Sequence, residues 1–248
     1  MKAQIVINDQ TYTIDLNQPS ADLSMAVSDV ARAWYINAPT FKPVVLGDWK
    51  GSVALGGAVN FFNVSFNPHA HGTHTETAGH ITKERHSINS NFKNPYTKSV
   101  LLTVTPIQGV VTFDDFLVQW ERASSKHWLD QTESVILRTE QHEGSLLREY
   151  SNTDWPFLAS EIGAFLRSSG IDHLIIDQPS VDQEEDGGAL ACHRSFWGAT
   201  PLESLHRTIT ELAHIPIEVT DGVYLLNLQV APLENDAAPS RPILYRLI

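Results

Sequence analysis

The sequence predicts a single mixed α/β domain spanning residues 1–248, and three observations support this class. The chain length, 248 residues, is that of one large domain or two small ones. Short apolar runs typical of strands covered on both faces alternate with segments of helical periodicity. Hydrophobic residues make up 42% of the chain and charged residues 19%, which is enough apolar material for a sizeable core.

The N-terminal third is predicted to consist mainly of strands and loops. Residues 1–16 alternate between apolar and polar positions around Asn8 and Asp9, which indicates a hairpin with its turn at that pair. A short helix is expected over residues 20–33, and the proline- and glycine-rich residues 39–57 predict loops between brief strands. Residues 59–67, rich in β-formers, predict a strand that leads into a histidine-dense segment.

The rest of the chain predicts strands alternating with helices. Strands are expected at residues 99–105, 134–139, 173–177, 222–230 and, after a proline-rich tail, 243–247. A helix is expected after Thr112, a candidate N-cap followed by acidic residues. A second helix is expected over residues 154–169, with Asp154 as a possible cap and Gly170 as the stop, and a weaker one over residues 203–212.

Charge and cysteine content exclude several classes of protein. The formal net charge is −12, from 29 acidic and 17 basic residues, which argues against a nucleic-acid partner because phosphate binding needs clustered Lys and Arg. Cys192 is the only cysteine in the sequence, so no internal disulfide demands an oxidising compartment. The N-terminus lacks the apolar region of a signal peptide, and no apolar run approaches the length of a membrane span. We therefore expect a soluble, cytoplasmic protein with no membrane partner.

A dense group of metal-ligand residue types follows the strand predicted at residues 59–67. The segment contains His69, His71, His74 and His80, with Glu76 among them. If residues 74–76 are extended, His74 and Glu76 project to the same face and could share one metal. A third ligand from His69 or His71 would give the three protein ligands typical of catalytic zinc, although the same ligand types also suit manganese or iron(II).

A purely structural role for these histidines is less well supported by the sequence than a metal-binding role. A single histidine is more often a structural residue than a ligand, and a histidine-rich tract can bind metal adventitiously. Such tracts are usually polar, whereas this one follows an apolar strand and contains Gly72 and Gly79, which allow close backbone approach or tight turns. The density and setting of the histidines favour a functional metal site.

The segment from Gly72 to Glu76, with His80 four residues further on, resembles the His-x-Gly-Thr-His-x-Asp-x-Pro-x-His signature of the metal-dependent cyclase and kynurenine formamidase (arylformamidase) family. Residues 170–182 are similar to that family's strand ending in Asp-x-Pro-Ser-Val-Asp, and residues 190–193 and 208–212 resemble two later motifs. The resemblance implies a cyclase-like swivelling β/β/α fold, with a barrel-like core flanked by helices. It also implies a homodimer or higher homo-oligomer.

The resemblance assigns roles to individual residues. His74 and Glu76 match two metal ligands of the family, and His80 matches its general acid and base. His193 and Glu211 match the remaining pair of ligands, which serve either one metal or two neighbouring metals. The implied cofactor is Zn²⁺, alternatively Mn²⁺, as one or two ions.

The sequence departs from the family pattern at several positions. Ala70 stands in the register of the first histidine ligand, so that role passes to His69 or His71, and we favour His69 because it directly follows the predicted strand end. Glu76 replaces an aspartate, which changes the reach of the carboxylate. Cys192 stands where a histidine is frequent; a thiolate could ligate zinc, but a small buried thiol is the simpler interpretation.

The leading functional hypothesis is metal-dependent hydrolysis of an amide-type bond in a small-molecule substrate. The resemblance suggests an aryl formamide such as N-formylkynurenine, or a cyclic relative such as isatin. A metal-dependent cyclase or lyase on the same scaffold is the alternative, and a non-catalytic metal-binding protein is the third reading, disfavoured because structural zinc sites are usually cysteine-rich. Six aromatic residues could line the substrate site, although aromatic residues of this kind more often belong to the core: Trp34, Tyr35, Phe61, Phe62, Phe92 and Trp197.

Overall fold

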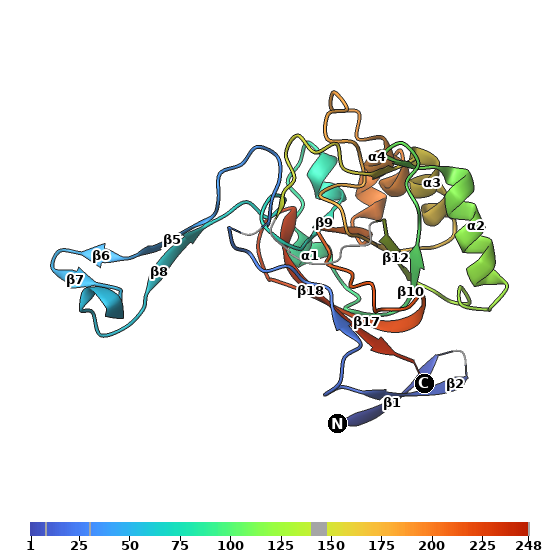
Figure 1. Ribbon diagram of the computed structural model, residues 1–248, viewed down its shortest axis with the longest axis horizontal. Coiled ribbons are helices and arrows are strands. Elements are labelled where there is room, and N and C mark those ends of the chain that lie inside the picture. The colour runs from blue at the N-terminus through green and yellow to red at the C-terminus, as the bar shows by residue number, and fades with distance from the viewer. Residues whose placement is uncertain (8, 30, 140–147, 248) are drawn as a thin grey trace.

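A closed β-barrel forms the centre of the protein in a computed structural model, which describes residues 1–7, 9–29, 31–139 and 148–247 (Figure 1). In spatial order its strands are β17 (Gly222–Val230), β10 (Tyr96–Thr103), β12 (Ser134–Arg138), β15 (His173–Ile176), β16 (Thr208–Glu211), β9 (His74–Thr77) and β18 (Ala237–Arg246). Pairing between β17 and β18 closes the ring. Strands β10, β12, β15 and β16 run parallel, and β9, β18 and β17 complete the barrel with antiparallel pairs.

Helices cover one side of the barrel. The α-helices are α1 (Ile88–Asn91), α2 (Phe113–Ser124), α3 (Ser160–Ser168) and α4 (Ala191–Trp197), and the 3-10 helices are η1 (Val53–Leu55), η2 (Ala78–Ile81) and η3 (Pro201–Ser204). Helices α2, α3 and α4 lie together against the parallel strands (Figure 1). None of the helices within the described ranges is both long and apolar enough to cross a membrane.

Two apolar layers explain the nearly continuous hydrophobic runs in the parallel strands. Along β10, Val100 and Leu102 pack with the buried faces of the helices, whereas Leu101 points to a second cluster. Strands β12 and β15 alternate in the same way, with Ile136 and Ile175 joining Leu101 in that second cluster. Because both faces of each strand are buried, each strand contains a run of three consecutive apolar residues.

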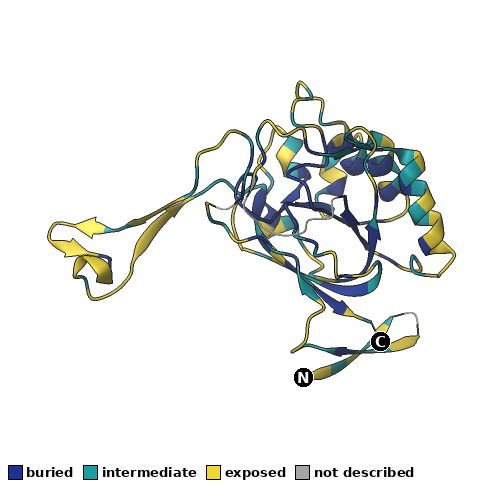
Figure 2. Ribbon diagram, in the orientation of Figure 1, coloured by how far each residue is buried: buried dark blue, intermediate teal, exposed yellow. Residues whose placement is uncertain are grey.

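Shorter elements surround the barrel. They are β1 (Lys2–Ile7) paired with β2 (Gln10–Asp15), β3 (Ala21–Asp22) on the edge of β18, β4 (Ala31–Arg32) paired with β13 (Arg148–Glu149), and β11 (Val110–Val111) paired with β14 (Phe157–Leu158). Residues 40–65, called the arm below, hold β5 (Thr40–Pro43), β6 (Val45–Leu46), β7 (Trp49–Lys50) and β8 (Phe62–Ser65). The arm projects away from the barrel (Figure 1), and most of its ribbon is coloured as exposed (Figure 2).

Most of the predicted elements are present. The N-terminal hairpin is confirmed by the pairing of β1 with β2, although Asn8 at its turn lies outside the described residues. Thr112 caps α2 as predicted, because its side chain accepts a hydrogen bond from the Asp115 amide. Gly170, with φ of 78°, follows the end of α3 as the predicted stop. The fold class, a mixed α/β domain with a barrel-like core flanked by helices, is confirmed.

Three helix predictions were wrong in whole or in part. The helix expected over residues 20–33 is replaced, within its described part, by the short strands β3 and β4. The helix expected over residues 203–212 is instead η3 followed by β16, because residues 208–211 complete the barrel between β15 and β9. Asp154 does not cap α3; the helix begins at Ser160, after a short strand β14. Tertiary pairing outweighed local propensity in each segment.

Candidate active site

Strand β9 places two of the predicted ligands on one buried face. His74 and Glu76 are two residues apart in an extended strand, so their side chains point the same way, and both are fully buried. In the register between β9 and β16, His74 lies directly opposite Glu211, the last residue of its strand. The antiparallel pairing of β9 and β16 therefore joins residues 137 positions apart in the chain.

The loop before β9 turns one histidine toward this face and another away from it. His71 is buried, with Nδ1 accepting from the Asn67 amide and Nε2 2.9 Å from the Asn37 carbonyl oxygen. His69 points to β9, where its Nδ1 lies 3.1 Å from Glu76 Oε2. Gly72 permits this path: its φ is 93°, and a Cβ there would lie 2.7 Å from the Met25 carbonyl oxygen.

The remaining predicted residues reach the same point from two helices. His80 lies in η2, directly after β9, with Nδ1 3.8 Å from Glu76 Oε2. Gly79 lies next to it, and a Cβ at that position would clash with the His86 carbonyl oxygen. His193 lies in α4, and its Nε2 is 3.0 Å from Glu76 Oε1. The structure thus brings His80 and His193 to Glu76.

Glu211 and His193 are oriented by the loop between β15 and α4. Glu211 Oε1 accepts a hydrogen bond from the Val181 amide, and Glu211 Oε2 lies 3.4 Å from His74 Nε2. Asp182 Oδ2 lies 2.6 Å from His193 Nδ1, and the same carboxylate accepts from the amides of Cys192 and His193 at the start of α4. Asp182 therefore anchors the helix terminus and the imidazole together.

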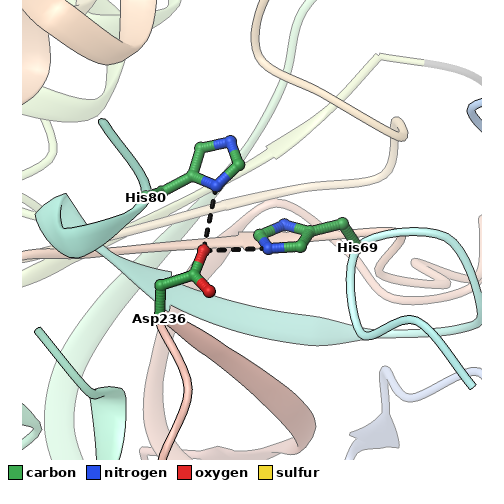
Figure 3. Close-up of side chains that lie close together, drawn as sticks. All are labelled: His69, His80 and Asp236. Carbon is green, nitrogen blue, oxygen red and sulfur yellow. Dashed lines mark hydrogen bonds and ion pairs between the residues drawn. The ribbon is translucent and has the colours of Figure 1, made fainter. Parts of the chain in front are cut away.

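Asp236 also belongs to the cluster, although no sequence motif indicated it. It lies immediately before β18, and the Thr77 amide donates to its carbonyl oxygen, which holds it beside β9. Its Oδ2 atom lies 3.0 Å from both His69 Nε2 and His80 Nδ1 (Figure 3). Asp236 is 156 residues from His80, so only the pairing of β9 with β18 could have revealed this contact.

The donor set fits a metal ion. Three groups of side chains in the described residues each offer ligand atoms within 4.8 Å of one another: His69, His74 and Glu76; Glu76, His80 and His193; His69, His80 and Asp236. Within the described residues, neither His74 Nε2 nor Glu76 Oε2 makes a hydrogen bond of good geometry, although Glu211 Oε2 lies 3.4 Å from the first and His69 Nδ1 lies 3.1 Å from the second. Leaving a buried imidazole nitrogen and a carboxylate oxygen without a hydrogen bond is costly unless a cation is bound there.

The charges of the cluster also favour a cation. Burial lowers the pKa of His69 because it disfavours the charged imidazolium. The hydrogen bond to Asp236 and the adjacent Glu76 carboxylate have the larger, opposite effect and raise the pKa of His69 to about 10. Burial likewise opposes the charge of Glu76, yet the charge of His80 and the hydrogen bonds from His193 and His69 hold the pKa of Glu76 well below its usual value. Protons on the imidazoles thus balance ionised carboxylates, and a bound metal would replace some of them.

A cavity of about 270 Å³ opens onto the cluster. Its lining combines site residues with apolar ones: Trp34, Asn67, His69, His80, Ser180, Leu190, His193 and Glu211. Trp34 and Leu190 both have left-handed backbone conformations, with φ of 61° and 46°. Bulky residues rarely adopt such angles, which tend to persist where the surrounding structure serves a binding site.

The six aromatic candidates occupy different settings: Tyr35 is 57% exposed, and Phe92 packs against the second apolar cluster. Trp34 lines the cavity and contacts Trp155, whereas Phe61 and Phe62 lie on the exposed arm. Trp197 is buried behind His193, with ring centroids 5.3 Å apart. Cys192 is fully buried in the apolar layer beside the helices, where burial raises the pKa of its thiol, so it behaves as a small apolar side chain.

Comparisons with known proteins agree on the family. Residues 21–183 match the family described as "Putative cyclase". A kynurenine formamidase of Bacillus thuringiensis subsp. konkukian is 27% identical over 225 residues, covering 90% of this chain and 95% of the relative. A kynurenine formamidase of Bacillus cytotoxicus is 34% identical over 121 residues, a match that spans about half of each chain, 48% and 52%.

Solved structures share the fold at low sequence identity. A structure described as a potential metal-dependent hydrolase with cyclase activity has a TM-score of 0.61 and 17% identity, covering 91% of this chain and 96% of that one. Isatin hydrolase A from Ralstonia solanacearum has a TM-score of 0.60 and 15% identity, covering 91% and 90%.

The chain belongs to the putative cyclase family, because the match covers well over half of its length. The resemblance inferred from the histidine segment is thereby confirmed. The prediction of an enzyme of the hydrolase class is confirmed as well, since two relatives that align with 90% of the chain are named kynurenine formamidase, a hydrolase activity.

Proposed function

We propose that the protein is a metal-dependent hydrolase of an aryl formamide, such as N-formylkynurenine, or of a related cyclic amide. The observation that carries the proposal is a pair of buried ligand atoms that make no hydrogen bond of good geometry, His74 Nε2 and Glu76 Oε2, beside a cavity lined by His69, His80 and His193. An unsatisfied donor set next to a small-molecule cavity is the arrangement a catalytic metal site requires.

His69, His74 and Glu76 would hold one ion, since their ligand atoms lie within 4.8 Å of one another. His193 and Glu211 would complete that shell or hold a second ion. Zn²⁺ is the expected metal, with Mn²⁺ as the alternative, because both accept imidazole and carboxylate ligands. When bound, the metal supplies Lewis-acid polarisation and lowers the pKa of water.

His80 is the proposed general acid and base. Its side chain is 30% exposed and lines the cavity, whereas the two predicted ligands on β9, His74 and Glu76, are buried. Its Nδ1 faces Asp236, which leaves Nε2 to take a proton from water and return it to the leaving nitrogen. An imidazole suits both transfers near neutral pH.

The cavity supports a compact substrate with an aromatic ring. Trp34 and Leu190 add apolar side chains to a lining that is otherwise polar, and the volume of about 270 Å³ is just below the usual range for ligand sites. An aryl formamide presents an apolar ring and one reactive amide, which matches these two kinds of side chain. The names of the curated relatives point to the same substrate class.

Metal content and turnover test the proposal. Purified protein should contain stoichiometric zinc or manganese by elemental analysis and should hydrolyse N-formylkynurenine. Glu76→Ala should lose both, whereas Glu84→Ala, a change of the same chemistry at an exposed position, should lose neither. Absence of bound metal after reconstitution with zinc and manganese would overturn the proposal.

A metal-dependent cyclase or lyase on the same scaffold remains the alternative, since it would use the same ligands. Reaction in ¹⁸O-labelled water separates the two, because hydrolysis places one water oxygen in the carboxylate product. Product without the label would rule out hydrolysis.

We also propose that residues 1–248 act as one domain, that the protein works in the cytoplasm without nucleic acid or membrane, and that it assembles as a homodimer or higher homo-oligomer. The formal net charge of −12 supports the absence of a nucleic-acid partner, and the single cysteine supports the cytoplasmic location.

A further inference from the structure

Asp236 makes one contact to a proposed metal ligand and one to the proposed acid and base. Figure 3 shows the imidazoles of His69 and His80 converging on a single carboxylate oxygen, Oδ2, at 3.0 Å each. The Asp236 side chain is 22% exposed, so these hydrogen bonds are partly shielded from water. A carboxylate oxygen accepts only, so both ring nitrogens that face it must carry protons.

This requirement determines which nitrogens remain available. For His80 the proton lies on Nδ1, and Nε2, which points away from Asp236 in Figure 3, keeps its lone pair. For His69 the proton lies on Nε2, and Nδ1, on the side of Glu76 and His74, is the atom left for a metal. One carboxylate therefore prepares both rings for different tasks.

We propose that Asp236 is a positioning residue that sets the tautomers of His69 and His80 together. The role assigned to His80 rests on the proposed hydrolase function, whereas the role at His69 requires only metal binding. Thr77 and Glu76 on β9 keep the carboxylate beside the rings, since the Thr77 amide bonds the Asp236 carbonyl oxygen and Ala237 pairs with Glu76.

Substitution of Asp236 tests the proposal with three measurements. Asp236→Ala should weaken Zn²⁺ affinity about 10- to 100-fold in competition with a chromophoric chelator, and should lower kcat by a similar factor with KM within about threefold. Asp236→Asn keeps an acceptor oxygen and should recover part of both losses. Long-range ¹H–¹⁵N spectra of the zinc-loaded protein should show the Nδ1–H form of His80 in the wild type and a mixture in Asp236→Ala.

The matched control is Glu234→Gln in the same segment. It removes one negative charge two residues away, but the Glu234 side chain bonds Asn89 and none of the site histidines. It should leave Zn²⁺ affinity, kcat and the spectra unchanged.

Two results would overturn the assignment of Asp236. Unchanged Zn²⁺ affinity and tautomers in Asp236→Ala would remove the positioning role. Loss of one whole ion from Asp236→Ala, with the other retained, would make Asp236 a ligand instead. If N-formylkynurenine is not turned over by the wild type, the proposed substrate fails, but the affinity and spectra still decide the role of Asp236.

Discussion

The site at β9 and the arm depart from ordinary burial in opposite directions. At the site, ionisable side chains are buried: Glu76 and His74 are fully enclosed. On the arm, apolar side chains such as Leu46, 68% exposed, face water. In each region the contacts within the chain leave side chains without a matching partner: the buried ligand atoms of the site would accept a cation, and the exposed apolar side chains of the arm would pack on an apolar surface.

The variant with the largest expected effect, His80→Ala, tests whether proton transfer and metal binding depend on different residues of the site. His80→Ala should lower kcat about 10²- to 10⁴-fold, because it removes proton transfer, while zinc content measured by elemental analysis stays at the wild-type level. The arm variant Leu46→Asp with Phe61→Asp should retain zinc as well. Wild-type kcat in His80→Ala would show that this imidazole does not transfer the proton.

Zinc should stabilise the site without being needed for the fold. At about 1,000 times its Kd, Zn²⁺ should raise the free energy of unfolding by about 4 kcal/mol, measured by urea titration. Glu76→Ala should abolish that increment. Chelation should remove activity yet leave the circular dichroism spectrum nearly unchanged, because a chain of this size has a sufficient core. Unfolding on chelation would instead indicate a structural metal.

His173 is a buried histidine at the other end of the barrel, and among the described residues no carboxylate is paired with its ring as at the site, so its burial should make stability depend on pH. His173 begins β15, bonds the Thr208 hydroxyl, and has its pKa lowered to about 4, chiefly by burial. The unfolded chain therefore binds more protons between pH 6.5 and pH 4, so stability present at pH 7 falls as the pH drops through this window. The loss approaches about 3 kcal/mol.

His173→Asn should remove most of this pH dependence, measured as the difference in unfolding free energy between pH 7 and pH 4.5. His127→Asn, at a side chain that is 85% exposed, is the control and should behave like the wild type. An identical pH dependence in wild type and His173→Asn would show that His173 is not the responsible group.

The smallest expected effect compares one glycine from each region. Gly72→Ala should destabilise the protein by about 2 kcal/mol, since φ is 93° and the new Cβ would contact the Met25 carbonyl oxygen. Gly47→Ala, on the arm with φ of 58° and open space around it, should cost about 1 kcal/mol. Thermal unfolding of both variants checks the difference; equal losses would mean that crowding at Gly72 is relieved elsewhere.

Sequence patterns predicted the barrel strands that are covered on both faces, because continuous apolar runs report burial directly. They failed where pairing partners decide the structure. Residues 208–211 contain two threonines and read as part of a weak helix, but they occupy the position between β15 and β9. The arm was predicted only as loops and strands, since local propensity does not report whether a strand has a core to pack on.

The sequence by itself determined the chemistry of this protein: a dense set of imidazoles and carboxylates, a strand that places His74 and Glu76 on one face, and the family to which they belong. Only the tertiary structure decided that His69 faces the site while His71 bonds backbone groups, and that Asp236 joins two imidazoles. The reason is physical. Alternation along a strand is a local property, whereas contacts across 156 residues arise only when the barrel closes and β18 pairs with β9.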